Sequence, residues 1–223
     1  MKKLFLGICI ISSAYSLAQT TYENFIEGYR FNKFLSQVTD GGKKINYDDV
    51  QGSAYLNKKF QQGIISGIKS EALLRYSTLL DNFEIRVNDD VYEIPRNSTF
   101  SEVRLLGDAQ RFILLDTGDD NKGYFQVLNS GNTKVLKKYR TIYRPERPTQ
   151  NPVLPNVPAT FEDQKPVYYI KFKDNTILVP KNFKDFSSLF SDKKTELEAF
   201  MKENKIKSLK EPDLIKIASF LDK

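Results

Sequence analysis

The chain has 223 residues, of which 40% are hydrophobic and 28% are charged, and its formal net charge is +6. It contains no histidine and one cysteine. The composition excludes a wholly disordered protein, and the missing residues exclude zinc sites and catalytic triads that depend on histidine. Any enzyme activity would have to depend on carboxylates, lysine, tyrosine or serine.

The first eighteen residues have the pattern of a cleavable secretory signal peptide. Two lysines precede an apolar run over residues 4–11, and the small residues Ser16 and Ala18 follow it. This predicts cleavage after Ala18 and export to the periplasm or the medium. Cys9 lies inside the apolar run and not at the cleavage point, which argues against a lipid anchor. No later segment approaches the length of a membrane span, so we expect a soluble or peripheral protein and not an integral one.

Residues 19–45 form an N-terminal segment in which apolar side chains recur at spacings of three and four. Phe25 and Tyr29 are one such pair. This spacing predicts a short helix within residues 22–38. Asp40, Gly41 and Gly42 would end it.

Residues 46–145 alternate between apolar and polar side chains, as strands with one buried face do. Turn-forming residues separate the short segments. The pattern predicts an antiparallel domain that forms a roll, barrel or sandwich. The expected strands cover residues 60–66, 71–77, 83–87, 91–95, 102–105, 110–116, 123–129 and 132–144.

Prolines are dense over residues 146–165, which predicts an extended linker between two parts of the chain. Residues 166–223 then predict a β-hairpin with its turn at Asp174 and Asn175, followed by three short amphipathic helices. Ser208 and Glu211 have the spacing of a capping box for the last helix. We therefore expect an α+β protein, mainly an antiparallel sheet with a C-terminal hairpin and a small helical cap.

The sequence Asp116-Thr117-Gly118 after an apolar run is similar to the catalytic loop of aspartic proteases. That chemistry needs two aspartates that share a proton, and the chain has only one copy of the motif. We interpret it instead as a hairpin turn. The oxygen-rich residues of the same loop, from Asp116 to Asn121, are a weaker candidate for calcium, because their spacing does not match an EF-hand. We expect no metal ligands and no cofactor.

Basic residues recur at even spacings along the last expected strand of the β domain, over residues 132–144. They are Lys134, Lys138, Arg140 and Arg144. On one strand they would share a face and could bind an anionic partner, such as a glycan, an anionic lipid or an acidic envelope protein. Export makes a nucleic acid unexpected. The alternative is an edge strand kept soluble by its charges.

Several stretches resemble uncharacterised exported proteins of Bacteroidetes, especially flavobacteria. They include residues 50–57, Leu74-Arg75-Tyr76, residues 123–128, and the tail around residues 190–214. The resemblance implies an envelope location and a β-rich fold, and it carries no activity. Tyr55 and Arg75 within these stretches fit a packed aromatic residue and an ion-pair partner.

These observations favour a non-catalytic binding or interaction module of the cell envelope. One alternative is a hydrolase that uses carboxylates, for which Glu84, Glu93, Glu102 and Asp116 would have to meet in a cleft. Another is a calcium-stabilised module of the kind found in adhesins.

Overall fold

The computed structural model describes residue 28, residues 31–149, residue 153 and residues 155–223. The expected signal peptide lies outside the described residues, as do residues 22–27, 29 and 30 of the helix expected over residues 22–38. Within residues 31–38 that helix prediction is wrong, because Asn32–Lys33 and the start of Gln37–Asp40 are strands.

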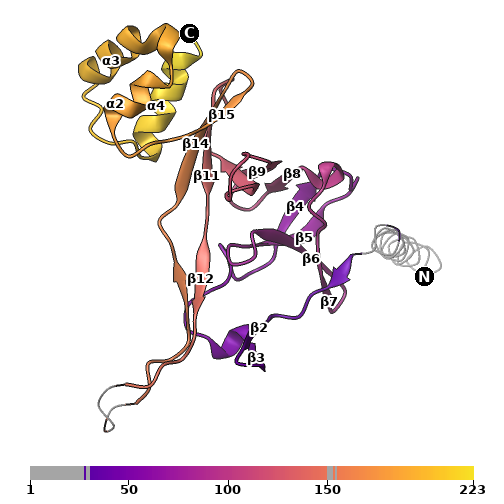
Figure 1. Cartoon of the computed structure of the whole chain (residues 1–223). Helices are drawn as coiled ribbons and strands as arrows, with labels where there is room; N and C mark the ends of the chain where they lie inside the picture. Colours follow the sequence, from indigo (N-terminus) through magenta and orange to yellow (C-terminus); the bar gives the residue numbers. More distant parts are fainter. Residues whose placement is uncertain (1–27, 29–30, 150–152, 154) are drawn as a thin grey trace, which may run out of the picture.

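A single open sheet of eleven strands dominates the fold (Figure 1), and it confirms the prediction of a mainly antiparallel α+β protein. The strand order is β1-β7-β6-β5-β4-β8-β9-β10-β11-β14-β15, and every neighbouring pair is antiparallel. The strands are β1 (Asn32–Lys33), β4 (Gln61–Ile65), β5 (Ala72–Ser77), β6 (Asn82–Val87), β7 (Asp90–Glu93), β8 (Glu102–Leu105), β9 (Gln110–Leu115), β10 (Gly123–Val127), β11 (Lys134–Lys138), β14 (Val167–Phe172) and β15 (Asn175–Leu178).

The alternation in the sequence decides which face of each strand is buried. On β5, Leu74 and Tyr76 enter the main core, whereas Arg75 between them faces the other side of the sheet. Phe83 and Phe112 pack against Tyr76 with ring centroids 4.9 Å and 5.0 Å away. Phe83, Phe112 and Leu74 are fully buried, so this aromatic cluster forms the centre of the curved sheet.

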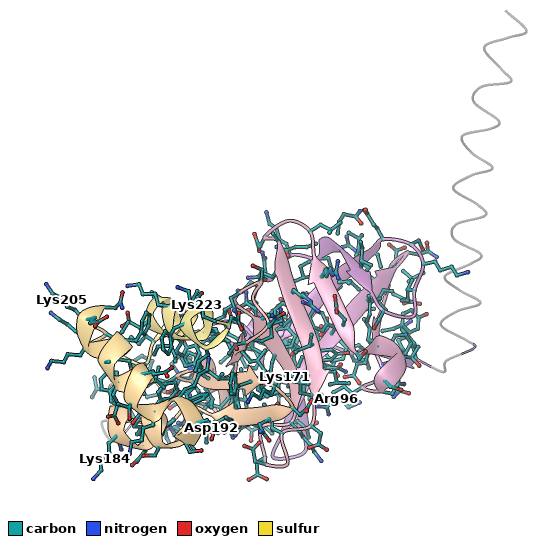
Figure 2. The ribbon with its side chains drawn as sticks, turned by 90° about the horizontal axis from the view of Figure 1, so that it is seen from above. Arg96, Lys171, Lys184, Asp192, Lys205 and Lys223 are labelled. Atoms are coloured by element: carbon teal, nitrogen blue, oxygen red, sulfur yellow. The ribbon has the colours of Figure 1, made fainter. Side chains whose placement is uncertain are left out.

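The C-terminal part follows the prediction closely. β14 and β15 form the expected hairpin, and three α-helices pack on it (Figures 1 and 2): α2 (Phe183–Ser188), α3 (Lys194–Glu203) and α4 (Glu211–Leu221). Their buried side chains join Val135 and Ile170 of the sheet in a second core. The capping-box prediction is wrong in detail, because Lys210 is the N-cap of α4 and the Ser208 hydroxyl donates to Asp213 instead.

The proline-rich segment is not a free linker. β12 (Thr141–Arg144) pairs with β13 (Thr160–Asp163), and Arg147 exchanges backbone hydrogen bonds with Val157 further along. This two-stranded ribbon prolongs the β11–β14 pair into a long arm (Figure 1). Two residues separate β11 from β12 and three separate β13 from β14, so one strand carries an extra residue, as in a β-bulge.

The segment over residues 37–55 reaches the face of the sheet opposite the main core, where Tyr55 contacts Arg75 of β5. A small hairpin of β2 (Gln37–Asp40) and β3 (Lys43–Asn46) precedes a 3₁₀ turn, η1 (Tyr47–Asp49). A third cluster contains Tyr47, Val50 and Phe161 of β13. The ribbon is therefore held against the N-terminal segment at its base. A further 3₁₀ turn, η2 (Ser98–Phe100), connects β7 with β8, and η3 (Ser191–Lys193) precedes α3.

Candidate functional site

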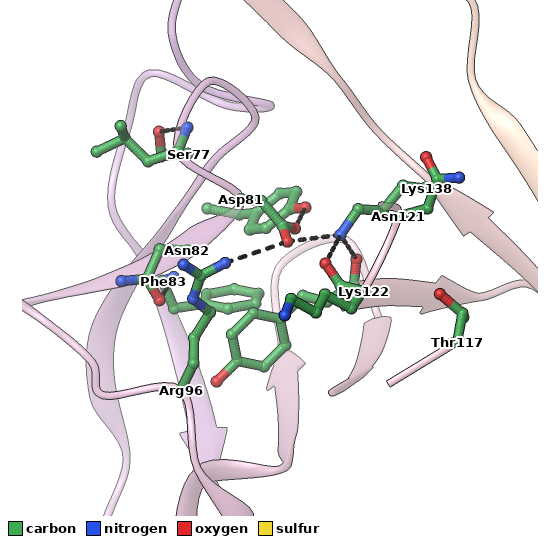
Figure 3. Close-up of polar contacts among 12 residues, drawn as sticks. Ser77, Asp81, Asn82, Phe83, Arg96, Thr117, Asn121, Lys122 and Lys138 are labelled. Carbon is green, nitrogen blue, oxygen red and sulfur yellow. Dashed lines mark hydrogen bonds and ion pairs between the residues drawn. The ribbon is translucent and has the colours of Figure 1, made fainter. Parts of the chain in front are cut away.

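A charged cluster lies where the β5–β6 turn meets β11, and it consists of Asp81, Lys138, Arg96 and Tyr76 (Figure 3). The Lys138 ammonium contacts Asp81 Oδ2 at 2.5 Å, and the Tyr76 hydroxyl donates to Asp81 Oδ1 at 2.6 Å. Arg96 approaches Asp81 Oδ2 from the opposite side, with Nη1 at 3.7 Å. The carboxylate thus joins elements that are far apart in the sequence.

The backbone is shaped to admit this carboxylate. Asp81 itself has φ +53°, in the left-handed region that aspartate tolerates better than most residues. Gly123, at the start of β10, has φ +135°, and a Cβ there would lie 1.7 Å from Asp81 Oδ2. Only glycine fits at this position.

Burial dominates the electrostatics of the pair. It raises the pKa of Asp81, and the attraction of Lys138 offsets this only in part. It lowers the pKa of Lys138, although Asp81 opposes the shift. Tyr76 keeps its proton because burial, followed by the neighbouring Asp81 charge, raises its pKa well above the usual value. The Lys138 ammonium is satisfied by Asp81 together with the backbone carbonyls of Tyr124 and Lys122.

The charged cluster forms one wall of a cleft of about 510 Å³, which we call the first cleft. Its cationic residues are Arg96, Lys122, Lys138 and Arg140, whereas Asp81 and Asp120 are its acidic residues. The lining therefore carries an excess of two positive charges. Tyr139, Tyr143 and Val167 supply much of its apolar surface.

Three of the four cations are open to a ligand. The Lys122 and Arg140 side chains have no ion pair or hydrogen bond to the residues that the structure describes. Arg96 is 49% exposed, and its contact with Asp81 is long and shared with Lys138. Lys138 is only 7% exposed and already paired.

The structure does not arrange the predicted basic residues as one stripe. The Lys134 ammonium donates to the backbone carbonyls of Ser130 and Gly131. Arg144 contacts Glu162 on the neighbouring strand at 2.9 Å. Lys138 and Arg140 both line the first cleft, but Lys138 is an internal ion-pair partner. Arg96 and Lys122 had no sequence signal, because they come from other turns of the chain.

The carboxylates proposed for a hydrolase do not meet in one cleft. Glu84 lies beside Glu93 on the neighbouring strand, but it is only 1% exposed and bonds to Arg75 at 2.5 Å. Glu102 pairs with two arginines on its own face of the sheet. Asp116 accepts a bond from the Gly118 amide in the β9–β10 turn.

Tyr55 and Arg75 have the two structural roles that fit their types. The Arg75 guanidinium lies 3.7 Å above the Tyr55 ring and donates to its hydroxyl. It also pairs with Glu84, so this group ties the N-terminal segment to β5 and β6. Glu84 Oε1 has no hydrogen-bond partner among the described residues, so Arg75 is the main group that compensates the buried carboxylate charge.

The acidic loop holds itself together through hydrogen bonds. Asp119 accepts bonds from Thr117, Asn121 and Tyr169, and these bonds lower its pKa to about 2. Among the described residues, no group of three or more acidic or sulfur ligands converges as a metal site would require.

No protein-family model, curated protein or solved structure matches this chain. Within the described part of the chain, no helix is both long and apolar enough to cross a membrane.

Proposed function

We propose that this is an exported, non-catalytic binding module of the cell envelope, and that its first cleft binds an anionic group. The observation that carries the proposal is the set of three open cations, Arg96, Lys122 and Arg140, on the walls of one cleft. The volume of the cleft is within the range of small-molecule sites.

The internal Asp81–Lys138 pair supports this role by its position. Because Lys138 already neutralises Asp81, the carboxylate does not hold Arg96 closely. The Arg96 guanidinium can therefore donate hydrogen bonds to an external anion. Arginine can bind a carboxylate, sulfate or phosphate through two parallel hydrogen bonds. Tyr139 and Tyr143 beside Arg140 give the cleft flat apolar surface for the uncharged part of a ligand.

The location rests on the signal-peptide pattern of residues 1–18, which lie outside the described residues. In an exported protein, anionic glycans are available ligands, whereas nucleic acids are not expected. The carboxylate hydrolase gains no support from the structure, because the carboxylates that it would need do not meet in one cleft. The calcium-stabilised module gains none either, because no group of acidic ligands converges among the described residues.

Calorimetric titration with a galacturonic acid oligomer at low salt tests the proposal. We expect binding that weakens about tenfold in Arg96→Gln and in Arg140→Gln, since each loses one charge-assisted contact. Arg144→Gln is the matched control, because it removes the same charge outside the cleft. Equal weakening in all three variants would show that only net charge matters and would contradict the proposal.

A further inference from the structure

A second cleft of about 550 Å³ lies next to the first, and the two share residues. Arg96 and Lys122 line both of them. The two clefts therefore meet at the two open cations, in a region bounded by the loop before η2 and the end of the β9–β10 turn.

The second cleft has a different chemistry. Asn97, Ser98 and Ser101 supply polar uncharged side chains, and Leu114 and Leu115 supply apolar surface. Asp116 is its one acidic residue. Such a lining suits hydroxyl-bearing rings, which combine hydrogen-bonding groups with apolar faces.

We propose that the two clefts form one binding site for a linear acidic glycan, with an anionic substituent seated between Arg96 and Lys122 and neighbouring sugar units in each cleft. This inference rests on the proposed function, since it assigns the ligand class of the same site. It goes further because it requires a chain of several units and gives the second cleft a role.

Two features favour a linear glycan over a single small anion or a membrane surface. A single anion would contact the shared cations and leave both clefts empty. A flat anionic membrane would engage cations at the tips of a protruding surface, whereas Arg96 and Lys122 line both clefts and Arg140 lines the first. Arg96 and Lys122 lie where the lining of the two clefts overlaps, and Arg140 lies in the first cleft, so the cations can pair with charges on more than one unit of a chain.

The test is a calorimetric length series with galacturonic acid oligomers of one to six units, with neutral oligomers of the same lengths as a control. We expect the affinity of the wild-type protein to rise at least tenfold from the monomer to the tetramer. Ser98→Trp should fill the second cleft and abolish this rise. Ser219→Trp, an exposed change on α4, should leave the whole series intact.

A second variant makes the test independent of any folding defect in Ser98→Trp. Asp116→Asn keeps the oxygen that accepts from Gly118 and removes the negative charge from the second cleft. It should strengthen binding of the longer oligomers only.

The outcomes separate this inference from the proposed function. Binding that depends on Arg96 but not on oligomer length would overturn the linear-glycan inference and keep the anion site. Binding of phosphatidylglycerol vesicles alone would likewise overturn the linear-glycan inference and keep the anion site. Failure of every anionic probe to bind would overturn the proposed function as well.

Discussion

The buried pair of Asp81 and Lys138 gives the sharpest prediction about stability. Lys138→Met removes the ammonium but keeps most of the apolar stem. Asp81 then remains with its side chain only 17% exposed and without its closest cation. Removing one partner of a buried ion pair typically costs 3–5 kcal/mol, because the other charge stays buried and uncompensated.

We expect a loss near the lower end of that range, about 3 kcal/mol. The reason is that the Tyr76 hydroxyl and the Arg96 guanidinium still contact the Asp81 carboxylate. The double variant Asp81→Asn with Lys138→Met should recover to within about 1 kcal/mol of the wild type, since replacing both charges removes two desolvation penalties together.

Urea unfolding at pH 7 of the wild type, both single variants and the double variant measures the coupling free energy directly. Acidification adds a check with a definite sign. The folded-state pKa of Asp81 is raised above its usual 3.8, so folding favours the protonated carboxyl. The stability that the protonated carboxyl contributes is lost as the pH rises through the folded-state pKa. The penalty in Lys138→Met should therefore shrink as the pH is lowered. A Lys138→Met penalty below about 0.5 kcal/mol, or a double variant as unstable as the sum of the two singles, would refute this account.

Three further changes test other parts of the fold. Arg75→Met should cost about 3–5 kcal/mol in urea unfolding, because Glu84 is buried and, among the described residues, no other cation pairs with it. Arg104→Met at an exposed pair should cost under about 1 kcal/mol. Similar costs for the two would contradict the burial argument. Asp119→Asn should lower stability above pH 4 and lose its effect towards pH 2. Hydrogen bonds lower the folded-state pKa of Asp119 to about 2, so the stability contributed by its carboxylate is lost as the pH falls through that value. A pH-independent difference in thermal unfolding would count against this. Asp222→Ala removes the acceptor of two backbone amides in the β10–β11 turn and should speed hydrogen exchange there and in α4, with the main sheet unaffected; unchanged exchange in α4 would show that the contact does not hold the cap.

Periodicity predicted most of the secondary structure because burial there follows local spacing. The alternation over residues 83–87 and 102–105 marks β6 and β8 closely. The three helices of the cap follow equally from the spacing of their apolar faces. These elements bury one face each, so the pattern in the sequence reflects the structure directly.

The proline-rich ribbon could not be predicted in the same way. Its strands pair across a register that brings Arg147 opposite Val157. Pro148 and Pro158 each follow a residue of this bonded pair, at positions whose amides face away from the partner strand in such a ladder. Their missing N–H groups therefore cost no ladder bond, and proline density alone did not distinguish this ribbon from a loop.

The candidate site was predictable only in part. Lys138 and Arg140 carry a local signal, and both line the first cleft. Asp81 lies 57 positions before Lys138, and Arg96 and Lys122 come from separate turns, so nothing in their local sequence marks them as neighbours. Even spacing also misplaced Lys134 and Arg144, because β11 and β12 are separate strands with a break at Tyr139 and Arg140.

The central claim is that an anionic ligand binds between Arg96, Lys122 and Arg140. Mapping of backbone amide chemical shifts during titration with a galacturonic acid tetramer tests it most directly. The account predicts shifts concentrated at residues 96–98, 120–123 and 139–143, and their loss in Arg96→Gln. Shifts confined to the helical cap or to the tip of the ribbon, or shifts unchanged by Arg96→Gln, would contradict it.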